Sequence, residues 1–116
     1  LAAYPQKVLK KLGAMCDALP EVSLTTQFGD PVWKAGKKSF LCVHHHEEHL
    51  SVQVWVGIEQ QGFLIDDERF SIPPYMGHNG WIDLNVEDET NWLEIESLVK
   101  TSYRHFALKR MLKQLD

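Results

Sequence analysis

The sequence predicts a single α+β domain of two layers, in which helices cover one face of an antiparallel sheet. Three observations indicate this class: an amphipathic helical pattern opens the chain, short β-type segments fill its middle, and a second helical pattern closes it. The connections between the middle segments are short and favour antiparallel hairpins, because a parallel crossover needs about a dozen residues or more. Two helices would then pack on one face of the sheet and leave the other partly solvated.

The first helix is predicted over residues 5–19. Its apolar side chains recur at spacings of three and four residues, as in the buried stripe of an amphipathic helix. These side chains belong to Val8, Leu9, Leu12, Met15, Cys16 and Leu19. Proline is tolerated in the first turn of a helix, and Pro20 predicts its end.

Five or six strands are predicted to follow as a meander. The clearest is residues 50–56, where Leu50, Val52, Val54 and Val56 alternate with period two and would share one face. Trp55 is out of phase and would point to the opposite side. The other predicted strands cover residues 22–28, 31–35, 39–44, 69–73 and 81–86, with residues 58–65 left as an ambiguous helical turn.

A rigid connection is predicted before the last strand. Pro73 and Pro74 lack backbone donors and must lie off any central ladder, while Gly77 and Gly80 permit a tight turn. This connection would deliver the aromatic side chains of Tyr75 and Trp81 to a sheet edge.

The last helix is predicted to start at Asn91, which suits a helix cap because Glu94 follows at the third position. Its apolar stripe then comprises Trp92, Ile95, Val99, Tyr103 and Phe106, and a helical pattern continues to the end of the chain.

The bulk composition predicts one globular domain spanning residues 1–116, since 44% of residues are hydrophobic and 24% charged. No apolar run approaches the roughly 20 residues of a membrane span. With only two cysteines, Cys16 and Cys42, we expect buried free thiols in a cytoplasmic protein. The net charge of −4 means that any nucleic-acid binding must depend on a local basic patch.

The order of these predicted elements resembles that of the MmcQ/YjbR family of small bacterial proteins. The resemblance covers nearly the whole chain, and its specificity lies in the order and spacing of short motifs. These motifs are Phe28-Gly29-Asp30-Pro31-Val32-Trp33-Lys34, Gly36-Lys37-Lys38-Ser39-Phe40, Pro74-Tyr75, Gly80-Trp81, Trp92 and Ser102-Tyr103. The resemblance implies a CyaY-like fold and a DNA-binding role through two β-hairpin wings, without a defined activity or known catalytic residues.

The basic hairpin that carries Lys34, Lys37 and Lys38 is the first candidate for nucleic-acid binding. A lysine-rich turn on a two-stranded ribbon can lie in a groove and contact phosphates. The alternative is that lysines at turns and edges only keep the sheet soluble.

A second basic cluster near the C-terminus contains Arg104, Lys109 and Arg110, flanked by Lys100 and Lys113. Cations at the end of a helix also complement its dipole, so a structural role is the alternative. The two clusters would form one footprint if they faced the same way, which the sequence does not establish.

The second functional hypothesis is a small-molecule or protein-binding module built on an aromatic pocket of Trp55, Tyr75 and Trp81. A weaker hypothesis is a metal site at His44 and His46, which would share one face of a strand. Cys42 and His44 lie too far apart along a strand to form an activated nucleophile, and no hydrolase or nucleotide-binding signature is present. We therefore expect a binding protein without a cofactor rather than an enzyme.

Overall fold

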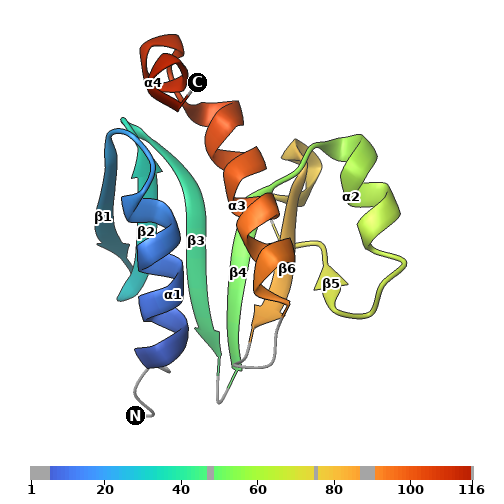
Figure 1. The fold of residues 1–116 in the computed structure, drawn as a ribbon. Helices are drawn as coiled ribbons and strands as arrows, with labels where there is room; N and C mark the ends of the chain where they lie inside the picture. Colours follow the sequence, from blue (N-terminus) through green and yellow to red (C-terminus); the bar gives the residue numbers. More distant parts are fainter. Residues whose placement is uncertain (1–5, 47–48, 75, 87–90, 116) are drawn as a thin grey trace.

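The computed structural model describes residues 6–46, 49–74, 76–86 and 91–115, and it confirms the predicted α+β class (Figure 1). One six-stranded antiparallel sheet carries α1 and α3 on the same face (Figure 1). The elements are α1 (Gln6–Asp17), β1 (Val22–Gln27), β2 (Asp30–Ala35), β3 (Lys38–His46), β4 (His49–Trp55), α2 (Ile58–Leu64), β5 (Phe70–Ser71), η1 (Gly77–Asn79), β6 (Trp81–Val86), α3 (Trp92–Phe106) and α4 (Lys109–Leu115). Within the described ranges, none of the helices has both the length and the apolar character needed to span a bilayer.

The sheet is a meander only through its first four strands, so the predicted simple meander was wrong at the end. The order is β1-β2-β3-β4-β6-β5, with β6 inserted between β4 and β5. After β4 the chain forms α2, passes through β5 at the edge, and returns through η1 to pair β6 with β4. Strand β5 has only two residues because Pro73 follows shortly after it and cannot donate to a ladder.

The core lies between the sheet and the helices α1 and α3, as the apolar patterns predict. Neighbouring strands contribute rows of directly opposed apolar side chains: Leu41, Val54 and Ile82 form one row, and Val43, Val52 and Leu84 form the next. The helices cover these rows with their buried stripes, which comprise Val8, Leu12 and Cys16 from α1 and Ile95, Val99 and Tyr103 from α3.

The first hairpin turns on Phe28 and Gly29, which both have positive φ angles, 53° and 83°. This is the arrangement of a type I′ turn, whose twist matches that of the flanking strands. Strands β1 and β2 pair in continuous register from Gln27 and Asp30 to Val22 and Ala35.

The connection between β5 and β6 is tight, as the glycines and prolines predict. Gly80 has φ of 92°, and a Cβ added there would lie 2.8 Å from the Cα of Gly57. The carbonyl oxygen of Gly80 accepts hydrogen bonds from the backbone N–H groups of Val56 and Gly57. The side chain of Gln61 in α2 is buried and donates to the carbonyl oxygens of Gly77 and Trp81. Helix α2 is therefore anchored to the start of β6.

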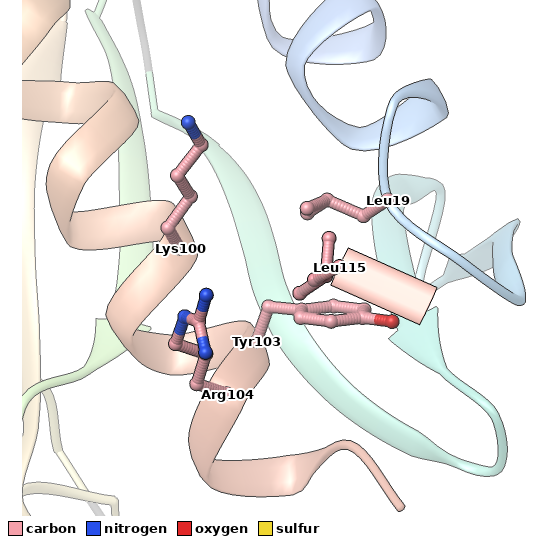
Figure 2. Close-up of a pocket in the computed structure, with 5 residues that line it drawn as sticks. All are labelled: Leu19, Lys100, Tyr103, Arg104 and Leu115. Carbon is pink, nitrogen blue, oxygen red and sulfur yellow. The ribbon is translucent and has the colours of Figure 1, made fainter. Parts of the chain in front are cut away.

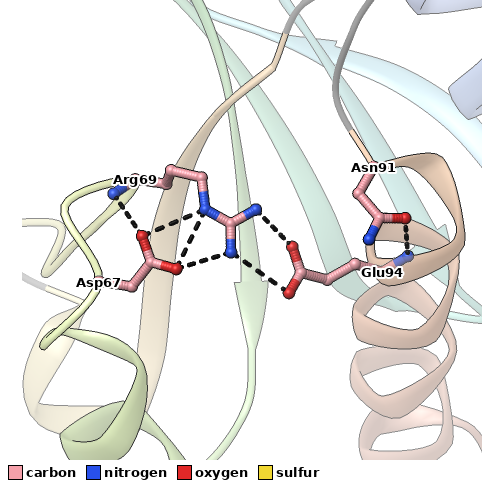
Figure 3. Close-up of polar contacts among 4 residues, drawn as sticks. All are labelled: Asp67, Arg69, Asn91 and Glu94. Atoms are coloured by element: carbon pink, nitrogen blue, oxygen red, sulfur yellow. Dashed lines mark hydrogen bonds and ion pairs between the residues drawn. The ribbon is translucent and has the colours of Figure 1, made fainter.

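The edge strand β5 is tied to α3 by the guanidinium of Arg69 (Figure 3). Arg69 lies 2.7 Å from a carboxylate oxygen of Asp67 and 2.8 Å from one of Glu94. Asn91 caps α3 by accepting a hydrogen bond from the backbone N–H of Glu94, which confirms the predicted start of this helix. The hydrogen bonds with Arg69 lower the pKa of Asp67.

The C-terminal helical pattern is broken into two helices rather than one. Ala107 has extended backbone angles, φ −68° and ψ 148°, and ends α3. Leu108 then starts a new turn, because its carbonyl oxygen accepts hydrogen bonds from the N–H groups of Met111 and Leu112. The apolar spacing alone did not reveal this break.

Candidate nucleic-acid interface

The two predicted basic clusters lie at the same end of the molecule. Gly36, in the turn between β2 and β3, packs on α4: a Cβ added to it would lie 3.7 Å from the Sδ of Met111. Lys37 and Lys38 are exposed beside this contact, and Lys109 and Arg110 are exposed on α4. In Figure 1 this turn and α4 share the end of the molecule at which α3 finishes. We call the residues Lys34, Lys37, Lys38, Arg104, Lys109 and Arg110 the basic end.

Charge is strongly segregated along the chain. Residues 31–46 and 97–115 contain no aspartate or glutamate, yet they hold eight of the twelve lysines and arginines. The net charge of −4 therefore originates in other parts of the chain. A local positive potential at the basic end is compatible with an acidic protein.

Arg110 is held by an ion pair with Glu21. Its Nη2 and Nε atoms donate to the two carboxylate oxygens of Glu21, at 2.7 and 3.0 Å. This pairing lowers the pKa of Glu21 and raises that of Arg110. The carbonyl oxygen of Glu21 also accepts from the N–H of Gly36, so Glu21 joins the basic turn to α4. Arg110 positions α4, and much of its charge is compensated.

Arg104 borders a cavity of about 170 Å³, which is lined by residues of α3 and α4 and by Leu19 in the connection between α1 and β1 (Figure 2). Lys100 and Arg104 form its cationic side, and Leu19, Leu115 and the ring of Tyr103 provide the apolar side. The hydroxyl of Tyr103 donates to the carbonyl oxygen of Pro20 at 2.6 Å. The ammonium of Lys100 also lies 3.6 Å from Glu96, one turn back along α3.

Lys34 is half-buried on β2, opposite Ser23 of β1 and Ser39 of β3. It is the most enclosed lysine of the set, whereas Lys37 and Lys38 project from the turn. Lys38 is near enough to His105 to help lower the pKa of that imidazole, although burial of His105 contributes more.

The aromatic side chains of the second hypothesis are used in packing. Trp55 stacks on His105 with ring centroids 3.5 Å apart and an interplanar angle of 6°. Its indole N–H also donates to the carbonyl oxygen of Asn79 at 2.9 Å. Trp81 is buried and lies 5.6 Å from the ring of Phe106. Tyr75 lies outside the described residues. Sequence reasoning missed His105, because nothing in the spacing of α3 marks it as a partner of β4.

The histidine run extends β3 to His46, two residues beyond the predicted end of this strand. The Nδ1 of His44 lies 3.5 Å from a carboxylate oxygen of Asp30, and the side chain of His46 is outside the description. No group of three metal-binding side chains occurs among the residues that the structure describes. Burial raises the pKa of Cys42 to about 11 and that of Cys16, more strongly, to about 12, so both thiols are protonated at neutral pH.

Comparisons with known proteins define the family. No curated protein matches this chain. Among solved structures, the fold is similar to that of the Deinococcus radiodurans protein DR2400, which carries a DUF419 domain, with a TM-score of 0.73. That similarity covers 92% of this chain and 86% of the other at 17% identity, and so concerns the fold alone. The model of the YjbR family matches residues 17–105, and the chain therefore belongs to the YjbR family.

Proposed function

We propose that this protein binds duplex DNA through the basic end, mainly by contacts to the phosphate backbone. The observation that carries the proposal is the packing of the Gly36 turn on Met111, which places two lysine-bearing segments side by side. Between them these segments contribute Lys37, Lys38 and Lys109, all exposed. Neutralisation of phosphates supplies most of the affinity in non-specific DNA binding.

The two segments have different tasks in this proposal. Strand β1 pairs with β2 as far as Ala35, so the turn of Gly36 and Lys37 closes the end of the sheet. The exposed side chains of Lys37 and Lys38 would contact phosphates there. Helix α4 would lie across the neighbouring backbone with Lys109 towards a phosphate. Arg110 acts indirectly, since its ion pair with Glu21 holds α4 beside the turn.

The cavity at Lys100 and Arg104 supports the same function. A cationic rim beside an apolar surface suits a phosphate whose attached sugar packs against the leucines. With so few cations, the affinity should be modest and should show little preference for sequence, because phosphate contacts carry no sequence information.

The test is fluorescence anisotropy with a labelled duplex at about 50 and 200 mM salt. Saturable binding should weaken at the higher salt, with a slope of log K against log salt of about −3.6 for four phosphate contacts, at Lys37, Lys38, Lys109 and the cavity, at about −0.9 for each. The double variant Lys37→Gln/Lys38→Gln should reduce the magnitude of this slope by about 2.

The matched control is Lys7→Gln/Lys10→Gln, which removes the same charge from the exposed side of α1. Equal losses in both double variants would indicate a general charge effect and would contradict the proposal. No binding at the lower salt would also contradict it. The alternative, a small-molecule-binding module, would then be tested by titrating small ligands into the protein while tryptophan fluorescence is measured.

A further inference from the structure

The outer edge of β1 is the least protected part of the sheet. Strand β1 lies at one end of the strand order and has six residues, Val-Ser-Leu-Thr-Thr-Gln, with no charge and no proline. Its register with β2 is continuous, without a bulge. Proteins normally block exposed edges with charges, prolines, bulges or very short strands, because an open edge pairs with other strands. The opposite edge, β5, is only two residues long.

The backbone groups of β1 that point outward can be assigned from the hairpin. In a two-residue hairpin the closing pair, here Gln27 and Asp30, is hydrogen-bonded, and hydrogen-bonded pairs then alternate along the ladder. The bond from Gly36 N–H to the Glu21 carbonyl oxygen, at 3.1 Å, follows the same alternation. Val22, Leu24 and Thr26 therefore direct their N–H and C=O groups away from β2, and no described strand pairs with them.

These outward groups are symmetric about Leu24, which lies midway between Val22 and Thr26. An antiparallel copy of the same strand can pair with them, with Leu24 opposite Leu24 and Val22 opposite Thr26. In this register, directly opposed residues of the two copies place their side chains on the same face of the sheet. The helices of the two copies would then lie on the same side of one continuous twelve-stranded sheet.

The side chains of the edge suit such a pairing. Leu24 is 60% exposed and shares the face of Trp33, its directly opposed partner on β2. Across the two-fold axis that would relate the copies, the two Leu24 side chains would cover each other. Glu21, the charged residue next to the strand, would lie opposite Gln27, so no like charges meet. Phe28, 96% exposed at the turn, would lie just beyond the ladder, opposite Pro20 of the second copy.

We propose that β1 is a homodimer interface, in which two copies join edge to edge about a two-fold axis at Leu24. A single pair of six-residue strands makes a small interface, so the dimer should be weak and depend on concentration. Sedimentation velocity at protein concentrations from about 10 µM to 1 mM would detect a dissociation constant within that range. The weight-average sedimentation coefficient should rise towards that of a dimer, and a monomer at every concentration would overturn the proposal.

Charge variants test the axis directly. Leu24→Lys places two like charges against each other and should weaken dimerisation at least tenfold, and Leu24→Glu should do the same. An equimolar mixture of the two variants should restore association, because opposite charges then meet at the axis. Failure of the mixture to associate would overturn the placement of Leu24 on the axis.

The control is Leu93→Lys, which adds the same charge at a leucine that is 80% exposed on α3. It should dimerise as the parent protein does, and an equal loss there would overturn the assignment to β1. Far-UV circular dichroism and thermal unfolding confirm that each variant is folded. The measurements contain no nucleic acid, so their outcome is independent of the proposed DNA binding.

Discussion

The hydroxyl of Ser102 on α3 donates a hydrogen bond of 2.6 Å to the carbonyl oxygen of Phe40 on β3. The same hydroxyl oxygen accepts one of 3.0 Å from the backbone N–H of Trp55 on β4. Phe40 lies where β3 carries one extra residue relative to β2, between the pairs Trp33–Leu41 and Lys34–Ser39. A fully buried side chain from a helix thus satisfies two backbone groups where the strands separate.

Replacing Ser102 with alanine should destabilise the fold strongly. Ser102→Ala leaves the buried C=O of Phe40 and the partly buried N–H of Trp55 without this partner, and each such loss costs about 1–3 kcal/mol. We expect the free energy of unfolding to fall by about 3 kcal/mol in urea denaturation. Ser97→Ala, at an exposed position of the same helix, should change it by no more than about 0.5 kcal/mol. Similar values for both variants would show that the bridge contributes nothing.

Replacing Phe28 with asparagine should stabilise the protein. Phe28 has φ of 53° and is 96% exposed, so it bears the cost of a left-handed backbone without burying its ring. Asparagine followed by glycine is preferred in type I′ turns, and Phe28→Asn should raise the free energy of unfolding by about 1 kcal/mol. Phe28→Ala should gain little, because alanine also disfavours this conformation. A loss of stability in Phe28→Asn would mean that the exposed ring makes contacts which the monomer does not show.

Two glycines should respond in opposite ways to alanine. Gly80→Ala introduces a Cβ 2.8 Å from the Gly57 backbone at a φ of 92° and should cost at least about 2 kcal/mol. Gly62 is exposed within α2, and apart from its chain neighbours and the backbone of its own helix no atom lies within 4 Å of an added Cβ. Gly62→Ala should stabilise the protein by about 0.5–1 kcal/mol, through higher helix propensity. Chemical denaturation of both variants measures the difference, and equal effects would contradict the close approach at Gly80.

The stack of His105 on Trp55 should make stability depend on pH. Burial, with a contribution from Lys38, lowers the pKa of His105 below its ordinary value of 6.5, so folding favours the neutral ring. Well above pH 6.5 neither state is protonated and the effect vanishes. As the pH falls through 6.5 towards the lower pKa of the folded state, the unfolded state takes up the proton first and stability decreases.

Thermal unfolding between about pH 5 and 7.5 measures this dependence. The variant His105→Phe keeps an aromatic ring on Trp55 but cannot titrate. It should lose less stability than the parent protein over the same interval. Parallel curves for the two proteins would exclude His105 as the source of the pH dependence.

Local patterns in the sequence predicted most of the fold. The apolar stripe of α1, the alternation from Leu50 to Val54 and the cap at Asn91 each express a preference of a few neighbouring residues. Such preferences operate within one helix or strand and need no knowledge of the rest of the chain. The class of fold and most elements followed from them, and so did the two candidate basic segments.

Only the tertiary structure decided how distant segments meet. The insertion of β6 between β4 and β5, the packing of Gly36 on Met111 and the stack of His105 on Trp55 join residues far apart in sequence. Their geometry depends on the path of the whole chain, which no local period encodes. The sequence by itself determined a two-layer α+β domain with two basic segments. The three-dimensional packing brought those segments to one end and left β1 as an open edge.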